Sequence, residues 1–199
     1  MKKNLFAILF VALSFASQAQ IIRANSVKVG ETKTATPSST VTTLRVGYLS
    51  ESLTAKYNSR SSSVDFSGGY LALDFNHSLS ANFGIDYGFV TSIGTYKELD
   101  SPQLDLRIPV MLSGTVALSD GLSLNGYVGP SFVIGILSDG YDHDLSRFDI
   151  GLNAIAELRY NKVNFHIGYG KGLLNRADDD DDDYSYKFGQ FYVGAGLSF

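Results

Sequence analysis

Strict alternation of apolar and polar side chains runs through most of this chain and restricts its fold more than any other feature of the sequence. Over residues 191–199, apolar residues occupy every second position, with Tyr, Gly or Ser between them. A period of two predicts a β-strand, because an amphipathic helix would repeat every 3.6 residues. The same pattern predicts eight strands, over residues 43–48, 70–76, 82–89, 103–113, 122–137, 148–160, 163–170 and 190–199.

The links between these strands alternate between short and long. Short links are expected at residues 77–80, 119–121 and 161–162, and longer ones at 50–63, 94–102, 138–146 and 171–186. Membrane barrels place short turns in the periplasm and longer loops outside the cell. We therefore predict an all-β fold, an eight-stranded antiparallel transmembrane up-and-down β-barrel, with short periplasmic turns and longer extracellular loops.

Alternation alone leaves open which face points inward, because a soluble barrel of the lipocalin kind encloses its apolar face. Charged residues recur in mid-strand on the polar face and are interleaved with glycines. This arrangement favours a packed polar lumen over an ordinary solvated surface. The residues assigned to this lumen network are Arg45, Asp74, Asp86, Asp105, Arg107, Asp149, Glu157, Arg159 and His166.

Aromatic residues near the strand ends of the apolar face also favour a membrane barrel, because amphipathic rings form girdles at the two water–lipid interfaces. The residues expected in these girdles are Tyr48, Tyr87, Phe148, Tyr160, Tyr169 and Phe199. The alternating last strand with its terminal aromatic residue resembles the signal by which outer-membrane proteins are recognised for assembly. That signal is assigned to Phe191, Val193, Leu197 and Phe199.

The N-terminal segment has the layout of a secretory signal peptide. Two lysines precede an apolar run over residues 5–13, and the small residue Ala19 marks the expected cleavage point. The run is too short for a transmembrane helix, which needs roughly 20 apolar residues. We expect residues 1–19 to be removed, residues 20–40 to form a flexible periplasmic segment, and residues 41–199 to form the barrel.

The composition argues against three further classes: disulfide-bonded proteins, lipoproteins and nucleic-acid-binding proteins. The chain has no cysteine, so it forms neither a disulfide nor the lipid-modified cysteine of a lipoprotein. Loss of Lys2 and Lys3 with the signal peptide changes the formal net charge from −4 to −6. An acidic mature chain argues against nucleic acid as a partner, because phosphate binding needs clusters of Lys and Arg.

A family resemblance rests on four parts of the sequence: residues 104–112, 127–136, 148–160 with 163–174, and 193–199. The chain resembles the eight-stranded outer-membrane β-barrel family of Bacteroidota, the porin-family or PorT-like proteins with an OmpA-type barrel. The resemblance covers roughly residues 41–199 and implies an outer-membrane location and a monomer, but it supplies no catalytic residues. Pro109 and Pro130 interrupt the pattern, and we predict local bulges there, because proline removes a ladder hydrogen bond.

Three constellations could carry chemistry. The lumen charges could form a structural plug of salt bridges, which is favoured. The alternative is an ion path or gate, formed by the arginines Arg45, Arg107 and Arg159 with the acids Asp105, Asp149 and Glu157. His166 could act as a catalytic base of a lipid-modifying enzyme, but this would need a nucleophile and an acid within hydrogen-bond reach. Carboxylates in two links could hold a loosely bound Ca²⁺ or Mg²⁺. The weak metal candidates are Asp142, His143, Asp144, Asp178, Asp180 and Asp182.

The expected function is that of a non-enzymatic outer-membrane barrel with a structural, envelope-assembly or interaction role. The alternatives are a narrow porin-like channel for small solutes or ions and, less favoured, a lipid-modifying enzyme. No dedicated cofactor is expected. The expected partners are outer-membrane lipid, lipopolysaccharide and the outer-membrane assembly machinery during biogenesis.

Overall fold

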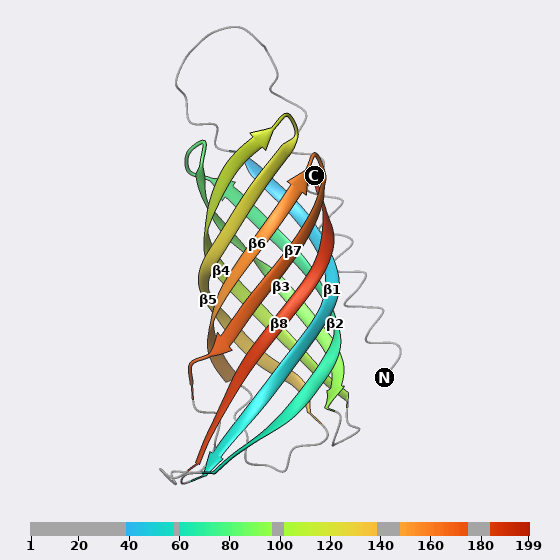
Figure 1. Ribbon diagram of the computed structural model, residues 1–199, viewed down its shortest axis with the longest axis vertical. Helices are drawn as coiled ribbons and strands as arrows, with labels where there is room; N and C mark the ends of the chain where they lie inside the picture. The colour runs from blue at the N-terminus through green and yellow to red at the C-terminus, as the bar shows by residue number, and fades with distance from the viewer. Residues whose placement is uncertain (1–38, 58–59, 97–101, 139–147, 175–183) are drawn as a thin grey trace, which may run out of the picture.

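The computed structural model describes residues 39–57, 60–96, 102–138, 148–174 and 184–199, which form a closed antiparallel barrel (Figure 1). Each strand pairs with its neighbours in the chain, and the first strand closes the barrel against the last. This confirms the predicted eight-stranded up-and-down topology. The strands are β1 (Thr40–Tyr57), β2 (Arg60–Ser78), β3 (Phe83–Tyr96), β4 (Pro102–Ser119), β5 (Leu122–Ser138), β6 (Phe148–Tyr160), β7 (Val163–Gly172) and β8 (Tyr184–Ser198).

Tight hairpins lie at one end of the barrel, which we call the turn end, and the opposite end is the loop end. The links β2–β3, β4–β5 and β6–β7 are short, as predicted. In the last two links, Gly121 has φ 72° and Asn161 has φ 52°. Both residues occupy the left-handed region that Gly and Asn tolerate best, and this allows reversal within a few residues.

The prediction of a long loop over residues 50–63 is wrong. β1 and β2 instead stay paired from Thr40↔His77 as far as Tyr57↔Arg60. The polar composition of this stretch suggested a loop, but its backbone hydrogen bonds are made in the sheet. β1, β2 and β8 therefore reach further than the other strands at the loop end (Figure 1).

The bulges predicted at Pro109 and Pro130 are also absent. The register of β4 with β3 is the same on both sides of Pro109, although pairing is interrupted between Tyr87↔Val110 and Val90↔Arg107. The irregularities in β4–β5 fall elsewhere, at Leu104/Asp105 and Ala117/Ser119. A missing proline N–H thus leaves a short gap in one ladder without an inserted residue.

The outward face of the strands is apolar and the inward face is polar. In β6 and β7, exposed and buried residues alternate almost without interruption. The exposed residues include Leu152, Leu158, Phe165 and Ile167, whereas Asn153, Glu157, Asn164 and His166 are buried. All six residues predicted for the aromatic girdles are exposed on this outer face. This distribution is the inverse of a soluble barrel.

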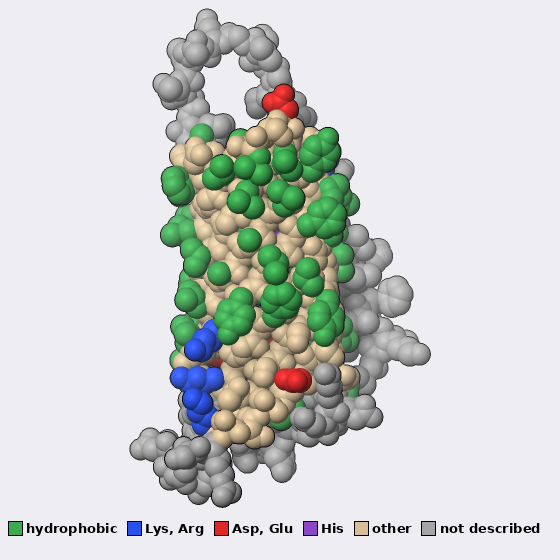
Figure 2. All heavy atoms as spheres, viewed as in Figure 1, with side chains coloured by type: hydrophobic (Ala, Val, Ile, Leu, Met, Phe, Trp, Pro, Cys, Tyr) green, Lys and Arg blue, Asp and Glu red, His purple; other side chains and the backbone are tan. Residues whose placement is uncertain are grey.

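The apolar outer face forms a belt around the barrel (Figure 2). β6 has 13 residues and carries apolar side chains outward from Phe148 to Tyr160. At about 3.3 Å per residue and a tilt of about 40°, this strand covers roughly 30 Å along the barrel axis. That height matches the roughly 25 Å apolar band, with flanking aromatic girdles, that a membrane barrel presents to lipid.

Within the described ranges, no helix is both long and apolar enough to cross a membrane. The segment expected to be a signal peptide, residues 1–19, lies outside the described residues, as does all but the end of the segment over residues 20–40.

Candidate functional site in the barrel lumen

Arg45 on β1 is the centre of the polar cluster nearest the turn end. Its guanidinium group donates from Nη1 to Asp74 Oδ2 and from Nη2 to Glu157 Oε2, each at 2.7 Å. The Arg45 guanidinium also lies over the ring of Tyr127, 5.1 Å from the centroid. A guanidinium group held by two carboxylates and an aromatic face is well compensated for its removal from water.

Glu157 on β6 completes this arrangement, which we call the Arg45 cluster. Its side chain is 0 % exposed. Its second oxygen, Oε1, accepts from Arg159 Nη2 at 2.7 Å, and from Tyr127 and Asn125 at 3.1 Å each. The donors come from β1, β5 and β6, so this one carboxylate ties together strands on different sides of the lumen.

A second polar cluster, the Arg107 cluster, lies nearer the loop end. Arg107 on β4 donates to Glu51 on β1 at 2.8 Å, and its Nη2 is 3.9 Å from Asp105. Gln103 donates from Nε2 to both oxygens of Asp105 at 3.0 and 3.1 Å. Arg107 Nε and Gln103 Oε1 are buried without a hydrogen-bond partner. This cluster is therefore less fully satisfied than the Arg45 cluster.

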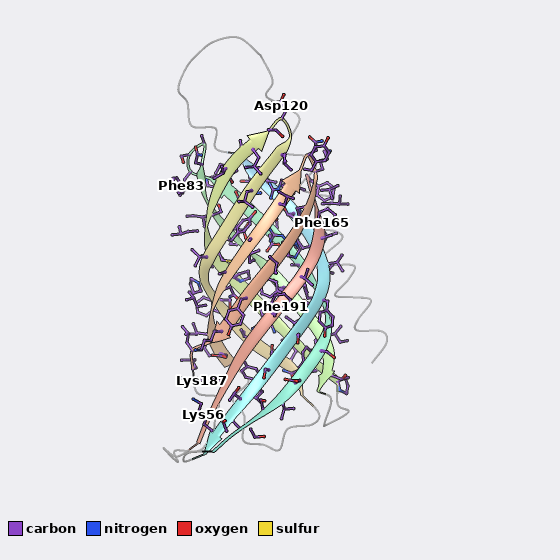
Figure 3. The ribbon with its side chains drawn as sticks, in the orientation of Figure 1. Lys56, Phe83, Asp120, Phe165, Lys187 and Phe191 are labelled. Atoms are coloured by element: carbon purple, nitrogen blue, oxygen red, sulfur yellow. The ribbon has the colours of Figure 1, made fainter. Side chains whose placement is uncertain are left out.

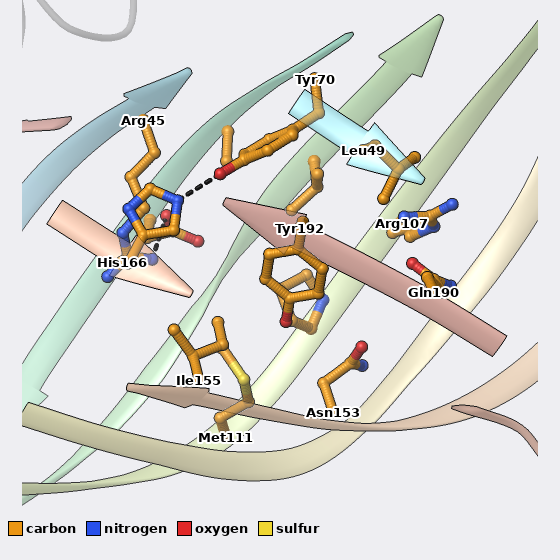
Figure 4. A pocket seen from close by; sticks show the side chains of 14 residues that line it. Arg45, Leu49, Tyr70, Arg107, Met111, Asn153, Ile155, His166, Gln190 and Tyr192 are labelled. Atoms are coloured by element: carbon orange, nitrogen blue, oxygen red, sulfur yellow. Dashed lines mark hydrogen bonds and ion pairs between the residues drawn. The ribbon is translucent and has the colours of Figure 1, made fainter. Parts of the chain in front are cut away.

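A small cavity of about 40 Å³ separates the two clusters (Figure 4). Arg45 and Arg107 both border it, together with Tyr70, Tyr192 and Met111. Since one water molecule needs roughly 10–15 Å³ by this measure, the cavity has room for about three. Three unpartnered polar atoms belong to its lining residues: Arg107 Nε, His166 Nδ1 and Gln190 Oε1.

His166 on β7 shares a hydrogen bond with Tyr70 on β2 through Nε2 (Figure 4). Among the described contacts, His166 Nδ1 has no partner, and no serine or carboxylate is joined to the ring. Tyr70 fits because the wall beside it is glycine: a Cβ added at Gly194 would lie 2.5 Å from the Tyr70 hydroxyl. The arrangement is that of a packed lumen histidine.

An apolar cluster occupies the inward face towards the loop end. Leu49, Leu53 and Phe66 are each at most 2 % exposed. With Tyr70, Ala72 and Phe188 they form one buried group, against which Val64, Val90 and Tyr192 pack. This apolar cluster has few polar groups that could replace the hydration shell of a passing ion, so it opposes ion passage.

In the structure, the residues assigned to the lumen network lie on the inner face, and most of them belong to one of the two clusters. Asp149 is also buried, and its Oδ1 accepts from the backbone N–H of Leu174 at 3.2 Å. Asp86 is buried, and its Oδ1 accepts a hydrogen bond from Asn76 Nδ2 at 3.5 Å. Sequence reasoning missed Glu51, Tyr70, Tyr127 and the whole apolar cluster.

Different signals could have identified the missed residues. Glu51 and Leu53 continue the inward phase of β1 beyond Arg45 and Leu49, which would be visible once the strand is extended. Tyr70 and Tyr127 stand on the polar face of their strands, where an aromatic ring is unusual. The cross-lumen pairing of Arg107 with Glu51 has no signal in a single sequence.

The six weak metal candidates, Asp142, His143, Asp144, Asp178, Asp180 and Asp182, lie outside the described residues. Within the described ranges, no group of three or more His, Cys, Asp or Glu residues is arranged to hold a metal ion. The residues assigned to the assembly signal, Phe191, Val193, Leu197 and Phe199, are exposed on the outer face of the closing strand and its end.

Comparison with known proteins gives structural likenesses only. No protein-family model matches the chain, and no curated protein sequence matches it. Solved structures with a similar fold include the outer membrane protein OprG of Pseudomonas aeruginosa, with 12 % identity and a TM-score of 0.47 over 81 % of this chain and 97 % of that one.

Two further structures are similar to this chain at the same level. Neisserial surface protein A from Neisseria has 13 % identity and a TM-score of 0.46 over 78 % of this chain and 97 % of its own. Ail, the attachment invasion locus protein of Yersinia pestis, solved with a heparin analogue, has 17 % identity and a TM-score of 0.44 over 80 % and 99 %. The eight-stranded barrel fold is assigned from the strand pairing of this chain itself.

Proposed function

We propose that this chain is an integral outer-membrane β-barrel without enzymatic activity, with a structural, envelope-assembly or interaction role. The observation that carries the proposal is the filling of the lumen: the Arg45 cluster lies nearest the turn end, the small cavity follows, and the Arg107 cluster and the apolar cluster lie side by side towards the loop end. An eight-stranded barrel is just wide enough for side chains to fill in this way. The apolar belt supports the membrane location.

The remaining parts of the proposal rest on the sequence. They are export by the signal peptide over residues 1–19, assembly through the terminal strand, a monomeric state, and a relationship to the PorT-like barrels of Bacteroidota. Lipopolysaccharide is the proposed lipid partner, and the acidic links around residues 142–144 and 178–183 are the proposed place of any loosely bound divalent cation. Their carboxylates are hard oxygen ligands of the kind that Ca²⁺ and Mg²⁺ prefer.

Single-channel recording tests the filled lumen. The refolded mature chain is placed in a planar bilayer, beside Arg107→Gln and Asp105→Asn variants, and folding is checked by the mobility shift on a denaturing gel before and after boiling. The proposal predicts a silent membrane for the folded wild-type protein. Steady openings whose conductance changes in the two variants would contradict the plug and make the lumen an ion path.

A narrow channel is the second candidate, and one observation favours it. Among the side chains that the structure describes, the lumen holds six buried carboxylates, from Glu51, Asp74, Asp86, Asp105, Asp149 and Glu157, and three arginines, Arg45, Arg107 and Arg159. This excess of acids would favour cations over anions in any path through the cavity. In the same recording, a channel of this kind would show a reversal potential shifted towards the cation equilibrium value in a salt gradient.

The lipid-modifying alternative depends on His166. Its tyrosine partner and its place in a filled lumen support a structural role. We therefore expect a His166→Ala variant to leave the lipid A and phospholipid profiles of the host membrane unchanged. A lost lipid product in cells that contain the folded variant would reinstate the enzyme.

A further inference from the structure

Three exposed lysines lie together on the outer face of the barrel at the loop end: Lys56 on β1, Lys171 on β7 and Lys187 on β8. The space-filling view shows basic side chains gathered directly below the apolar belt (Figure 2). Lys56 and Lys187 lie beyond Phe191 along the barrel, at the opposite end from Asp120 (Figure 3). We call these three residues the lysine patch.

The strand register explains why the three side chains gather. Lys171 on β7 is paired with Gly189 on β8, and Lys187 lies two residues along on the same outward face. Lys187 is in turn paired with Thr54 on β1, and Lys56 lies two residues beyond Thr54. Each lysine is therefore a diagonal neighbour of the next, at about 7–8 Å, within the reach of long side chains.

The boundary between the patch and the belt is aromatic. Tyr169 on β7 is paired with Phe191 on β8, and both rings are exposed. A Cβ added at Gly189, between the lysines, would lie 3.3 Å from the Tyr169 hydroxyl. The tyrosine thus extends its hydroxyl from the belt over a side-chain-free position towards the lysines, as an amphipathic ring does at a membrane interface.

The patch is also uncompensated within the described residues. No ion pair of the described structure involves any of the three lysines, whereas the three lumen arginines are all paired with carboxylates. Three like charges at diagonal positions repel one another, so the arrangement favours an anionic partner. A phosphate group accepts hydrogen bonds from ammonium and hydroxyl donors alike, and both kinds are present here.

We propose that the lysine patch, with the Tyr169 hydroxyl, binds the phosphate groups of the outer-leaflet glycolipid. This inference rests on the proposed membrane location, because the belt sets the depth at which the patch meets the lipid. A headgroup whose acyl chains lie along Phe191 and Tyr169 places its phosphates at the level of the lysines. Free phosphate would gain the charge attraction but not the contact of acyl chains with the belt.

Lipid retention in nanodiscs tests the proposal. The mature chain is inserted in phosphatidylcholine nanodiscs that contain a small fraction of lipid A or of dephosphorylated lipid A, and the lipid retained on the protein is counted by native mass spectrometry. The variants are a triple K56Q/K171Q/K187Q chain, K187Q alone, and K162Q. Lys162 is the matched control, because it is an exposed lysine in the β6–β7 turn at the opposite end.

A basic side chain near an anionic surface contributes roughly a fivefold change in affinity. We expect K187Q to lower lipid A retention about fivefold, the triple variant to lower it at least tenfold, and K162Q to leave it unchanged. Dephosphorylated lipid A should be retained equally by all four proteins. An excess of inorganic phosphate should compete only weakly with lipid A in the wild-type protein.

Three results would overturn the inference: equal lipid A retention by the wild-type and triple-variant proteins, an equal loss in K162Q, or complete displacement of lipid A by inorganic phosphate. Failure of the proposed membrane location would look different. The wild-type chain would then not insert even in nanodiscs of phosphatidylcholine alone, where the lysine patch has no ligand to bind.

Discussion

The two ends of the lumen are packed by different means. Near the turns, Glu157 accepts bonds from two arginines, a tyrosine and an asparagine, and its side chain has no exposed surface. Near the loops, Leu49, Leu53 and Phe66 fill the same kind of space with apolar contacts, and the polar Arg107 cluster beside them leaves Nε unpartnered. The cavity lies where the two kinds of packing meet.

This difference shows what a filled barrel requires from each part. A buried ion-pair cluster depends on every partner, because removal of one leaves a charge without compensation in a medium of low dielectric constant. An apolar cluster depends on volume, so the loss of one side chain leaves a cavity but no bare charge. The Arg45 cluster should therefore be sensitive to the chemistry of single atoms, and the apolar cluster to side-chain size.

The largest expected effect is at Glu157. Glu157→Gln preserves the shape of the side chain but removes the charge that two arginines share, so the free energy of unfolding should fall by about 3–5 kcal/mol. Urea unfolding of the protein in lipid vesicles measures this change. A loss as small as that of an exposed Lys162→Gln control would show that the cluster is not buried as described.

A smaller effect is expected at Leu53, in the apolar cluster. Leu53→Ala should lower the free energy of unfolding by about 2–3 kcal/mol, because the lost methyl groups leave a cavity. Leu53→Met, which keeps the volume, should cost less than about 1.5 kcal/mol. If the two variants lose equal amounts of unfolding free energy, side-chain volume does not determine the stability of the apolar cluster.

At Gly194 on β8, beside the Tyr70 ring, the free energy of unfolding should respond to the addition of a single methyl group. Gly194→Ala would bring a Cβ against the backbone of β1 and within 2.5 Å of the Tyr70 hydroxyl, so we expect a loss of about 2 kcal/mol from overpacking. Gly126 is the matched control, because an added Cβ there meets nothing within 4 Å. If both substitutions are neutral by the same unfolding assay, the tyrosine is not packed on the glycine wall.

How far the sequence alone predicts this molecule depends on the distance over which the relevant forces act. Alternation along each strand is local, and it correctly predicted an antiparallel barrel of eight strands; it also assigned Arg45, Glu157 and His166 to a face that is buried in the structure. The stretch over residues 50–63 was misjudged because Ser and Thr suit loops and strands alike. Its strands form because β1 pairs with β8 on one side and β2 on the other.

The candidate site was only partly predictable for the same reason. The pairing of Arg107 with Glu51 joins residues from β4 and β1 across the lumen, and nothing in their local sequence encodes it. The bulges at Pro109 and Pro130 were predicted from the missing N–H alone. The paired strands around each proline keep the register, so the barrel tolerates a gap in one ladder.

The smallest expected effect is at Tyr70, which borders the cavity and belongs to the apolar cluster. Tyr70→Phe removes the hydroxyl that bonds to His166 and keeps the ring in the apolar cluster, so the free energy of unfolding should fall by about 1 kcal/mol. The same urea titration measures it. A loss as large as that of Glu157→Gln would place Tyr70 among the essential members of the turn-end network instead.

The direction in which each face points is the central claim, and spin labels on β6 test it most directly. Because the chain has no cysteine, single cysteines introduced at residues 152–156 can carry a nitroxide in vesicles. We predict that labels at 152, 154 and 156 collide with lipid-soluble oxygen, and that labels at 153 and 155 are shielded from it. Accessibility of the even positions to a water-soluble relaxation agent instead would contradict the membrane barrel.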